Sequence, residues 1–193
     1  MASVRSLCVY CGSSNTVRPL FLEAAYDFGR ILGRSGVELI YGGGRVGLMG
    51  RLADGCLAEG GRVVGIIPHH LHSREVAHSG VTELLLVDSM HIRKSMMAER
   101  ADAFAILPGG LGTLDEMFEI LTWRQLGLHD KPIVLADLDG YWGKLDALLQ
   151  AMTAEGFAPA PHRLFMRVDS IEAILPELAA ARQPQRTQAT ARL

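Results

Sequence analysis

Residues 103–126, AFAILPGGLGTLDEMFEILTWRQL, join an apolar run, a glycine-rich turn and a longer segment of mixed polarity. The run Ala103–Leu107 predicts a buried strand, and Thr113–Leu126 predicts a helix that follows the loop Pro108–Gly112. A strand without polar alternation is typical of a parallel sheet that helices cover on both faces. In open sheets of this kind, ligands bind in loops at the carboxyl ends of the strands.

The same order of strand, turn and helix recurs along the chain. The expected strands are Val4–Cys11, Val37–Tyr41, Arg62–Ile67, Glu83–Val87, Ala103–Leu107, Pro132–Ala136 and Leu164–Val168. The expected helices are Pro19–Arg34, Gly47–Glu59, Ser89–Arg100, Thr113–Leu126, Tyr141–Glu155 and Ser170–Ala181, the last tolerating or bending at Pro176. The sequence therefore predicts a single-domain α/β fold, with a doubly wound, mostly parallel Rossmann-like sheet and helices on both faces. We expect this domain to span residues 1–182, with a flexible C-terminal tail at 183–193 and a polar loop at Pro68–Gly80.

Length, charge and hydropathy narrow the class of protein. A chain of 193 residues suits one domain, and its formal net charge of −2 gives no support for nucleic acid as a partner. A single-stranded DNA-binding module is disfavoured in the same way, because no basic stripe with aromatic side chains is present. No apolar run is long enough to cross a bilayer, and the first residues lack a signal-peptide pattern. We therefore expect a cytoplasmic protein without a membrane partner.

The three cysteines, Cys8, Cys11 and Cys56, do not suggest a disulfide framework. Cys8 and Cys11 have the spacing of a redox motif, which normally lies at the start of a helix. Here both fall in a predicted strand, where residues three apart point to opposite faces. We expect packed or partly exposed thiols.

The first of two glycine loops, Gly42–Gly50, follows a strand and opens a helix with a Gly-x-Gly-x-x-Gly match. Glycines such as Gly43 and Gly44 allow the backbone to approach a phosphate or sugar closely. A dinucleotide site would also need an acidic residue at the end of the next strand, which instead ends at Ile67 and Pro68. NAD is therefore not expected, and a tight turn without a ligand remains an alternative.

The second glycine loop predicts a phosphate cradle. Gly109, Gly110 and Gly112 expose backbone N–H groups, the Thr113 hydroxyl adds a donor, and the positive end of the helix dipole points at the loop. The loop is not a Walker motif, because no lysine follows the last glycine. Thr113 and Glu116 also match a capping box, in which Glu116 would only cap its own helix.

A wider set of motifs resembles one known family. Met90-His91-x-Arg93-Lys94, followed by Pro108-Gly109-Gly110-x-Gly112-Thr113-x-x-Glu116, is similar to the LOG (lonely guy) family of cytokinin-activating phosphoribohydrolases. The early Gly12-Ser13-Ser14, the Tyr41–Gly50 loop and Thr122-Trp123-x-Gln125-Leu126-Gly127 agree, so that the likeness spans roughly residues 5–175. It implies a Rossmann-like fold, a homodimer, and hydrolysis of AMP or N6-substituted AMP, a small-molecule nucleoside monophosphate. It also implies catalytic roles for Arg93 and Glu116.

Each site residue has an expected part in this chemistry. Glu116, placed in the first turn of its helix, is expected to stay ionised and to act as a base or an electrostatic stabiliser. Arg93 would orient Glu116 or hold the ribose hydroxyls, and Lys94 could add positive charge for the phosphate. The remaining residues expected to bind substrate are Ser13, Gly43, Gly44, Met90, Gly109, Gly110, Gly112 and Thr113.

Several alternatives concern cofactors and the class of function. We expect no metal, because His69, His70 and His72 have no carboxylate or cysteine that completes a ligand pattern. We expect no pyridoxal phosphate, because no lysine lies in a recognisable cofactor cradle. Hydrolysis by this route needs no cofactor. A non-catalytic nucleotide carrier or sensor would keep both glycine loops and remains the alternative to an enzyme.

The expected homodimer has a candidate interface. The segment Thr113–Leu126 carries more apolar surface than one core-facing stripe needs, and we expect this helix to lie near the interface. The apolar residues in question are Phe118, Ile120, Leu121, Trp123 and Leu126.

Overall fold

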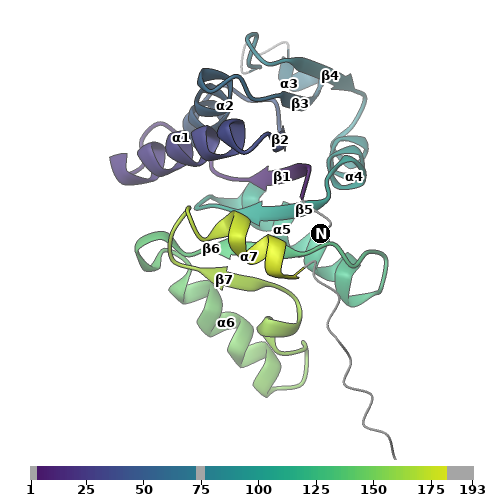
Figure 1. The fold of residues 1–193 in the computed structure, drawn as a ribbon. Coiled ribbons are helices and arrows are strands. Elements are labelled where there is room, and N and C mark those ends of the chain that lie inside the picture. The colour runs from purple at the N-terminus through teal and green to yellow at the C-terminus, as the bar shows by residue number, and fades with distance from the viewer. Residues whose placement is uncertain (1–3, 73–76, 182–193) are drawn as a thin grey trace, which may run out of the picture.

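The computed structural model describes residues 4–72 and 77–181, in which seven parallel strands form one sheet. The strands are β1 Ser6–Tyr10, β2 Glu38–Tyr41, β3 Val63–Pro68, β4 Glu83–Val87, β5 Ala103–Ile106, β6 Ile133–Ala136 and β7 Met166–Val168. Their order across the sheet is β4-β3-β2-β1-β5-β6-β7 (Figure 1). The chain runs outward from β1 to β4 and returns to place β5 on the other side of β1. The order therefore reverses between β1 and β5, the point where doubly wound folds bind ligands.

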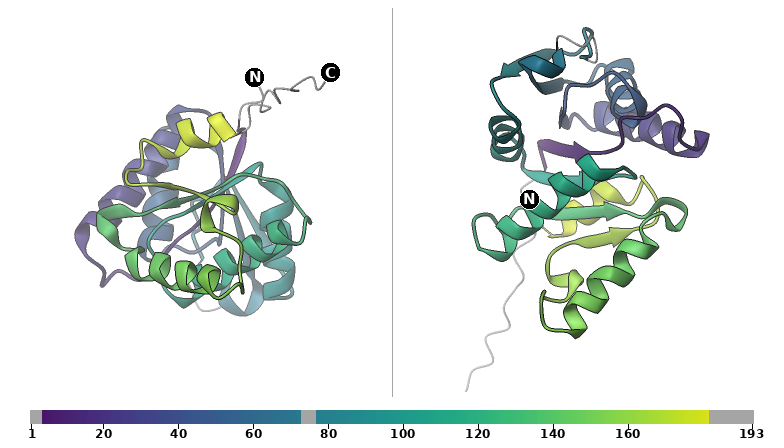
Figure 2. Two further views of the ribbon diagram at one scale, coloured as in Figure 1. Left: turned by 90° about the horizontal axis from the view of Figure 1, so that it is seen from below. Right: turned by 180° about the vertical axis from the view of Figure 1, so that it is seen from behind.

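Helices cover both faces of this sheet, as the two views of Figure 2 show. One apolar cluster packs α1 (Pro19–Arg34), α2 (Gly47–Ala58) and α7 (Ile174–Ala181) against the sheet. The other packs α4 (Met90–Arg100), α5 (Leu111–Gln125) and α6 (Gly143–Ala154) against the opposite face. Burial of these two apolar layers is the main source of stability. The predicted α/β architecture is confirmed, with a sheet that is parallel throughout.

The cysteines and glycines explain how the layers fit together. Cys8 and Cys11 are buried in different apolar clusters, as their spacing predicted, and both are free thiols.

Helices α1 and α2 approach each other closely at two glycines. A Cβ on Gly29 would lie 2.1 Å from the Leu52 carbonyl oxygen, and one on Gly55 would lie 2.0 Å from that of Tyr26. These two glycines let the helix backbones come into contact.

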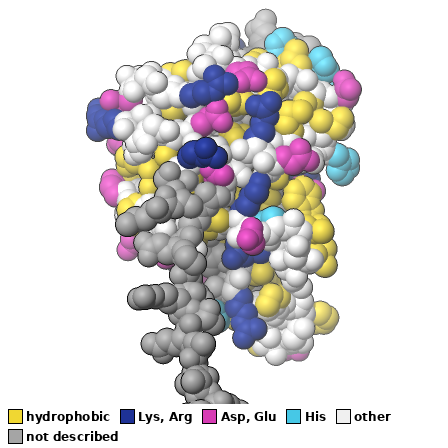
Figure 3. Space-filling model, turned by 45° about the vertical axis from the view of Figure 1, so that its right-hand side comes forward, with side chains coloured by type: hydrophobic (Ala, Val, Ile, Leu, Met, Phe, Trp, Pro, Cys, Tyr) yellow, Lys and Arg dark blue, Asp and Glu magenta, His cyan; other side chains and the backbone are white. Residues whose placement is uncertain are grey.

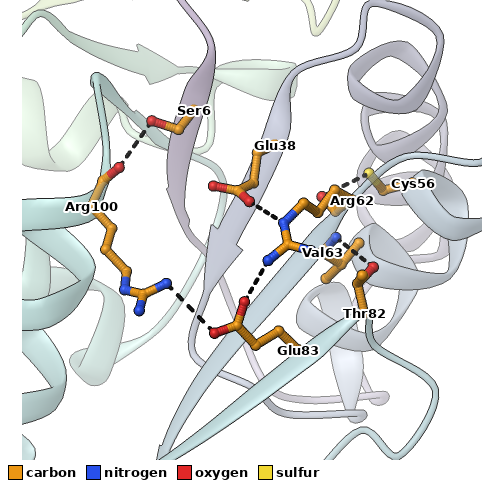
Figure 4. A network of polar contacts seen from close by, with 8 residues as sticks. All are labelled: Ser6, Glu38, Cys56, Arg62, Val63, Thr82, Glu83 and Arg100. Atoms are coloured by element: carbon orange, nitrogen blue, oxygen red, sulfur yellow. Dashed lines mark hydrogen bonds and ion pairs between the residues drawn. The ribbon is translucent and has the colours of Figure 1, made fainter.

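A polar network joins the amino ends of the strands (Figure 4). The Arg62 guanidinium contacts Glu38 at the start of β2 and Glu83 at the start of β4, each at 2.5 Å. Arg100, at the end of α4, lies 3.8 Å from Glu83. These ion pairs are partly exposed, so each contributes little stability, about 0–1 kcal/mol. They lie at the end of the sheet opposite to the glycine loops, and they link neighbouring strands there.

The structure corrects several details of the expected elements. Part of the predicted loop Pro68–Gly80 is ordered as the end of β3 and a short helix, α3 (His69–His72). Helix α6 begins at Gly143 because the preceding residues form the 3-10 turn η1 (Leu138–Gly140), and a second such turn, η2, spans Pro161–Arg163.

Helix α7 begins at Ile174, so Pro176 falls in its first turn, where no N–H is needed. Helix α5 begins two residues earlier than predicted. The proposed tail at 183–193 lies outside the described residues. No helix within residues 4–72 and 77–181 combines the length and apolar character that a membrane span requires.

Candidate active site

A cavity of about 910 Å³ opens at the carboxyl ends of the central strands. Its walls include Cys11–Ser14 after β1, Gly42 and Gly44 after β2, and the glycine loop 108–113 after β5. The cavity therefore lies at the reversal of strand order between β1 and β5, where the topology predicts a ligand site.

Arg93 and Glu116, the two expected catalytic residues, meet in this cavity. Arg93 comes from α4 and Glu116 from α5, and Nη1 of Arg93 lies 3.3 Å from Oε1 of Glu116. Arg93 is 7% exposed and Glu116 is 8% exposed. An ion pair shielded from water in this way interacts much more strongly than one at the surface.

Backbone carbonyl groups fix the Arg93 guanidinium. Its Nε donates to the Ile66 carbonyl oxygen at 3.1 Å, and its Nη2 donates to the Gly42 carbonyl oxygen at 3.3 Å. Nη1 also lies 3.8 Å from the Met90 sulfur. A Cβ on Gly42 would lie 1.8 Å from Nη2 of Arg93. A side chain at position 42 would therefore displace the guanidinium from the position in which the two carbonyl groups hold it.

Glu116 differs from the expectation in its position and its charge. Because α5 begins at Leu111, Glu116 lies in the second turn and not the first. Burial raises the pKa of Glu116 to about 7, against the opposing effect of the Arg93 charge. The expectation of a carboxylate kept fully ionised by the helix dipole was therefore wrong. A carboxyl group with a pKa of about 7 has both protonation states populated at neutral pH, which suits proton transfer.

The capping-box alternative for Glu116 is also excluded. The N-cap of α5 is Gly110, so Thr113 and Glu116 do not occupy the positions that a capping box requires. Thr113 is buried and lines the cavity. Its side chain folds over Gly109, where a Cβ would lie 2.0 Å from Oγ1 of Thr113.

The second glycine loop is open towards the cavity. Gly110, Leu111 and Gly112 line it, and a Cβ on Gly110 or Gly112 would have no neighbour within 4 Å. The first N–H groups of any helix lack partners within that helix. At α5 these donors border a cavity, and the positive end of the helix dipole adds to their field. The geometry is compatible with the predicted phosphate cradle.

The first glycine loop is instead filled by the chain itself. The Gly47 N–H, at the start of α2, donates to Oδ1 of Asn15 at 2.8 Å, and a Cβ on Gly47 would lie 2.3 Å from the Ser14 nitrogen. The Gly43 carbonyl oxygen accepts from the His78 N–H at 2.9 Å. Gly43 and Gly47 thus allow close packing, Gly42 makes room for Arg93, and Gly44 lines the cavity.

Lys94 lies away from the cavity wall. Its Nζ is 3.1 Å from both Oδ2 of Asp115 and Oε2 of Glu119. Burial would lower the pKa of Lys94, but hydrogen bonds to the two carboxylates outweigh it and the pKa is raised. Arg93 lines the cavity, whereas Lys94, the next residue on the helix and about 100° further round it, does not. Lys94 joins α4 to α5 beside the Arg93–Glu116 pair, and the structure does not place it where the phosphate role would need it.

The other expected binding residues are mostly brought together. Ser13, Gly44 and Met90 line the cavity with the second glycine loop, whereas Gly43 packs against Ile67 behind it. Further residues that the sequence did not single out also line the cavity, among them Cys11, Arg18, Phe21, Gly42 and Tyr141. Gly42 could have been found as the first glycine of its run, but no sequence signal marked the other four.

Metal and Schiff-base chemistry find no support among the described side chains. His69, His70 and His72 lie on the short helix α3, and no described group of three His, Cys, Asp or Glu side chains could hold a metal ion. None of the three lysines, all within the described ranges, lines the cavity. Burial raises the pKa of the Cys11 thiol, so this lining residue is a poor nucleophile.

Comparison with known proteins identifies relatives. Residues 49–178 match the model of a family described as "possible lysine decarboxylase". A probable cytokinin riboside 5′-monophosphate phosphoribohydrolase of Oryza sativa subsp. japonica is 46% identical over 82% of this chain and 70% of its own length. The cytokinin riboside 5′-monophosphate phosphoribohydrolase of Rhodococcoides fascians is 44% identical over 93% of this chain and 90% of its own length.

Solved structures share the fold at lower identity. A molybdenum cofactor binding protein of Rippkaea orientalis superposes with a TM-score of 0.70 at 21% identity, covering 93% of this chain and 98% of that chain. The molybdenum cofactor carrier protein of Chlamydomonas reinhardtii gives 0.71 at 17% identity, covering 92% and 98%. At these identities the likeness shows the fold alone.

The raised pKa of Glu116 predicts a pH-dependent difference in stability. The folded state keeps a proton on Glu116 up to about pH 7, whereas the unfolded chain loses it near the ordinary value of 4.5. Stability of the native protein therefore falls as the pH rises through this window. Glu116→Gln removes the titration. The melting temperature of the variant should therefore rise relative to that of the native protein as the pH is raised from 5 to 8.

Thermal unfolding of both proteins across this range measures the effect. Glu172→Gln, the same change at an exposed position, is the matched control. A difference in melting temperature that stays constant, or that moves against the Glu116 variant as the pH rises, would refute the buried-carboxyl account.

Proposed function

The chain belongs to the LOG family of cytokinin riboside 5′-monophosphate phosphoribohydrolases, and on that premise we propose that its cavity hydrolyses nucleoside 5′-monophosphates to free base and ribose 5-phosphate. The substrates are AMP and N6-substituted AMP. The observation that carries this proposal is the buried pair of Arg93 and Glu116, 3.3 Å apart in the one cavity that also contains the open glycine loop.

The chemistry requires a group that can accept a proton next to a developing cation. Cleavage of the C1′–N9 bond builds positive charge on the ribose, as in other glycoside hydrolyses. Water forms the new bond to C1′, its proton passes to the Glu116 carboxylate, and the base leaves with the electron pair of the broken bond. A pKa of about 7 makes Glu116 an effective base at neutral pH and lets it return the proton to the departing base.

Arg93 serves this reaction by keeping Glu116 in place. Two backbone carbonyl oxygens hold its guanidinium group, so the position of this group is fixed by the backbone of the sheet. A charge arranged in advance of the reaction stabilises the transition state without reorganisation. Arg93 also lowers the pKa of Glu116 against the effect of burial, which maintains a reactive ionised fraction.

The cavity lining offers groups that suit both the phosphate and the base of a nucleotide. The start of α5 offers free backbone donors and the Thr113 side chain to a phosphate. Apolar side chains of Met49, Ile67 and Leu71 also line the cavity, and they can accommodate a base with or without an apolar N6 substituent. A volume of about 910 Å³ is within the range of small-molecule sites.

The alternative of a non-catalytic nucleotide carrier is less well supported. A carrier would need the glycine loops, but it would not need a buried carboxyl group with a raised pKa beside an arginine. Lysine decarboxylation through a Schiff base is not supported either, since none of the chain's three lysines lines the cavity.

We also propose that the enzyme is a cytoplasmic homodimer with α5 near the interface. Leu126 and Leu128, after the end of α5, are 67% and 69% exposed, and Phe118 and Trp123 are half-buried. Ile120 and Leu121 belong to the core, so the expected apolar surface is smaller than the sequence analysis proposed. Figure 3, which turns the side of α4 forward, shows hydrophobic side chains among charges of both signs. Three free cysteines are compatible with a reducing compartment.

Light scattering at micromolar concentration tests the dimer. The chain has a mass of 20.9 kDa, and we expect the native protein to scatter with twice that mass. The double variant Leu126→Glu/Leu128→Glu should shift the species towards the monomer. Charged residues on an exposed surface that no partner covers would have no such effect. A native protein that scatters as a monomer would contradict the proposed assembly.

The proposed activity predicts a strong dependence on the substrate phosphate. AMP should be hydrolysed with a kcat/KM at least about 100-fold above that of adenosine, because the donors at the start of α5 act only on the phosphate. Chromatography of released adenine measures both rates. Equal kcat/KM values for the two substrates, or no adenine from AMP, would contradict the proposal.

A further inference from the structure

A segment between β6 and α6 reaches across to the second glycine loop. Asp137, buried at the end of β6, accepts a hydrogen bond from the Trp142 N–H at 2.6 Å and pairs with Arg167. Between these anchors, Asp139 (φ 53°) and Gly140 (φ 70°) both adopt the left-handed conformation. Asp and Gly are among the residues that tolerate this conformation. The resulting turn directs Tyr141 towards the cavity, which it lines.

Tyr141 makes one polar contact with the glycine loop. Its hydroxyl donates to the Gly109 carbonyl oxygen at 2.6 Å. Its ring and that of Phe21 make a T-shaped contact at 5.4 Å between centroids, and the Arg18 guanidinium lies 4.5 Å from the centre of the Phe21 ring. Arg18 is in turn paired with Asp139 at 2.6 Å. Residues of α1, the loop before it and the turn after β6 thus hold the tyrosine in place.

This hydrogen bond has a consequence for an anion in the cavity. The Gly109–Gly110 peptide is trans and planar, so fixing its carbonyl group also fixes the direction of the Gly110 N–H. The carbonyl oxygen carries partial negative charge, and a bond from the tyrosine hydroxyl reduces its repulsion of a nearby phosphate. The N–H then points away from the tyrosine and remains available as a donor. Glycine on both sides of the peptide leaves it no side chain to resist rotation.

We propose that Tyr141 is a positioning residue for the anionic end of the substrate. Its hydroxyl holds the Gly109–Gly110 peptide in the orientation that binds phosphate. This role rests on the proposed function, because it assumes a phosphate at the start of α5. It concerns binding of the phosphate, and the residues that act on C1′ are separate from it.

Tyr141→Phe removes only the hydroxyl and tests this role. KM for AMP should rise roughly 3- to 10-fold, the effect of one hydrogen bond, while kcat changes by less than about 2-fold. The kcat/KM for adenosine, which has no phosphate, should stay the same. The dissociation constant of inorganic phosphate, measured by calorimetry, should rise with the KM for AMP. Tyr26→Phe, a tyrosine on α1 that contacts Arg51 outside the cavity, is the matched control and should leave all four values unchanged.

The outcomes separate this proposal from the proposed function. Suppose that the native protein releases adenine from AMP, but that Tyr141→Phe has the native KM, or that its kcat/KM falls equally for AMP and adenosine. The positioning role is then wrong and the proposed function stands. If the native protein does not act on AMP, the proposed function fails. The phosphate measurement then still judges Tyr141, and equal affinity in both proteins, or no phosphate binding, overturns its role.

The melting temperature of Tyr141→Phe should lie no more than about 2–4 °C below that of the native protein, since the hydrogen bond is exposed.

Discussion

A buried guanidinium group must have acceptors for its N–H donors, and this requirement shapes the centre of the molecule. Arg93 donates hydrogen bonds to the carbonyl oxygens of Gly42 and Ile66, and its charge is paired with the carboxylate of Glu116. The two carbonyl groups lie at the carboxyl ends of β2 and β3, and the carboxylate lies on α5, after β5. One side chain therefore connects the two halves of the sheet across the point where the strand order reverses. The glycine at position 42 and the burial of Glu116 are both consequences of this position of the Arg93 side chain.

This arrangement contributes chemistry more than stability. Removing two charged groups from water offsets most of the attraction between them, so a buried ion pair is a weak source of folding energy. The apolar clusters on the two faces of the sheet supply that energy. Lys94, between Asp115 and Glu119, connects the same two helices and helps to keep the pair aligned. The pKa of the resulting carboxyl group lies near neutral pH, and the apolar clusters offset the free-energy cost of burying it.

The sequence predicted elements with strong local signals and missed features that depend on packing. Apolar runs such as Ala103–Leu107 identified the strands, and the second glycine loop marked the binding edge of the sheet. Arg93 and Glu116 came from the resemblance to a known family. The direction of Lys94 depends on carboxylates of α5, and the pKa of Glu116 depends on burial, so neither could be predicted from a local pattern. Tyr141 lies 32 residues from Gly109 in the sequence, and only the fold brings the two together.

The central claim is that the buried carboxyl group of Glu116 performs the chemistry and does not merely fill the cavity. Single-turnover hydrolysis of AMP by Glu116→Gln tests it most directly, with AMP affinity measured on the same protein by calorimetry. Glutamine preserves the shape of the side chain and removes its charge and its capacity to accept a proton. The account predicts that the rate of adenine release falls by about 100-fold or more while the dissociation constant of AMP stays within about 3-fold. A folded variant that releases adenine at the native rate would contradict it.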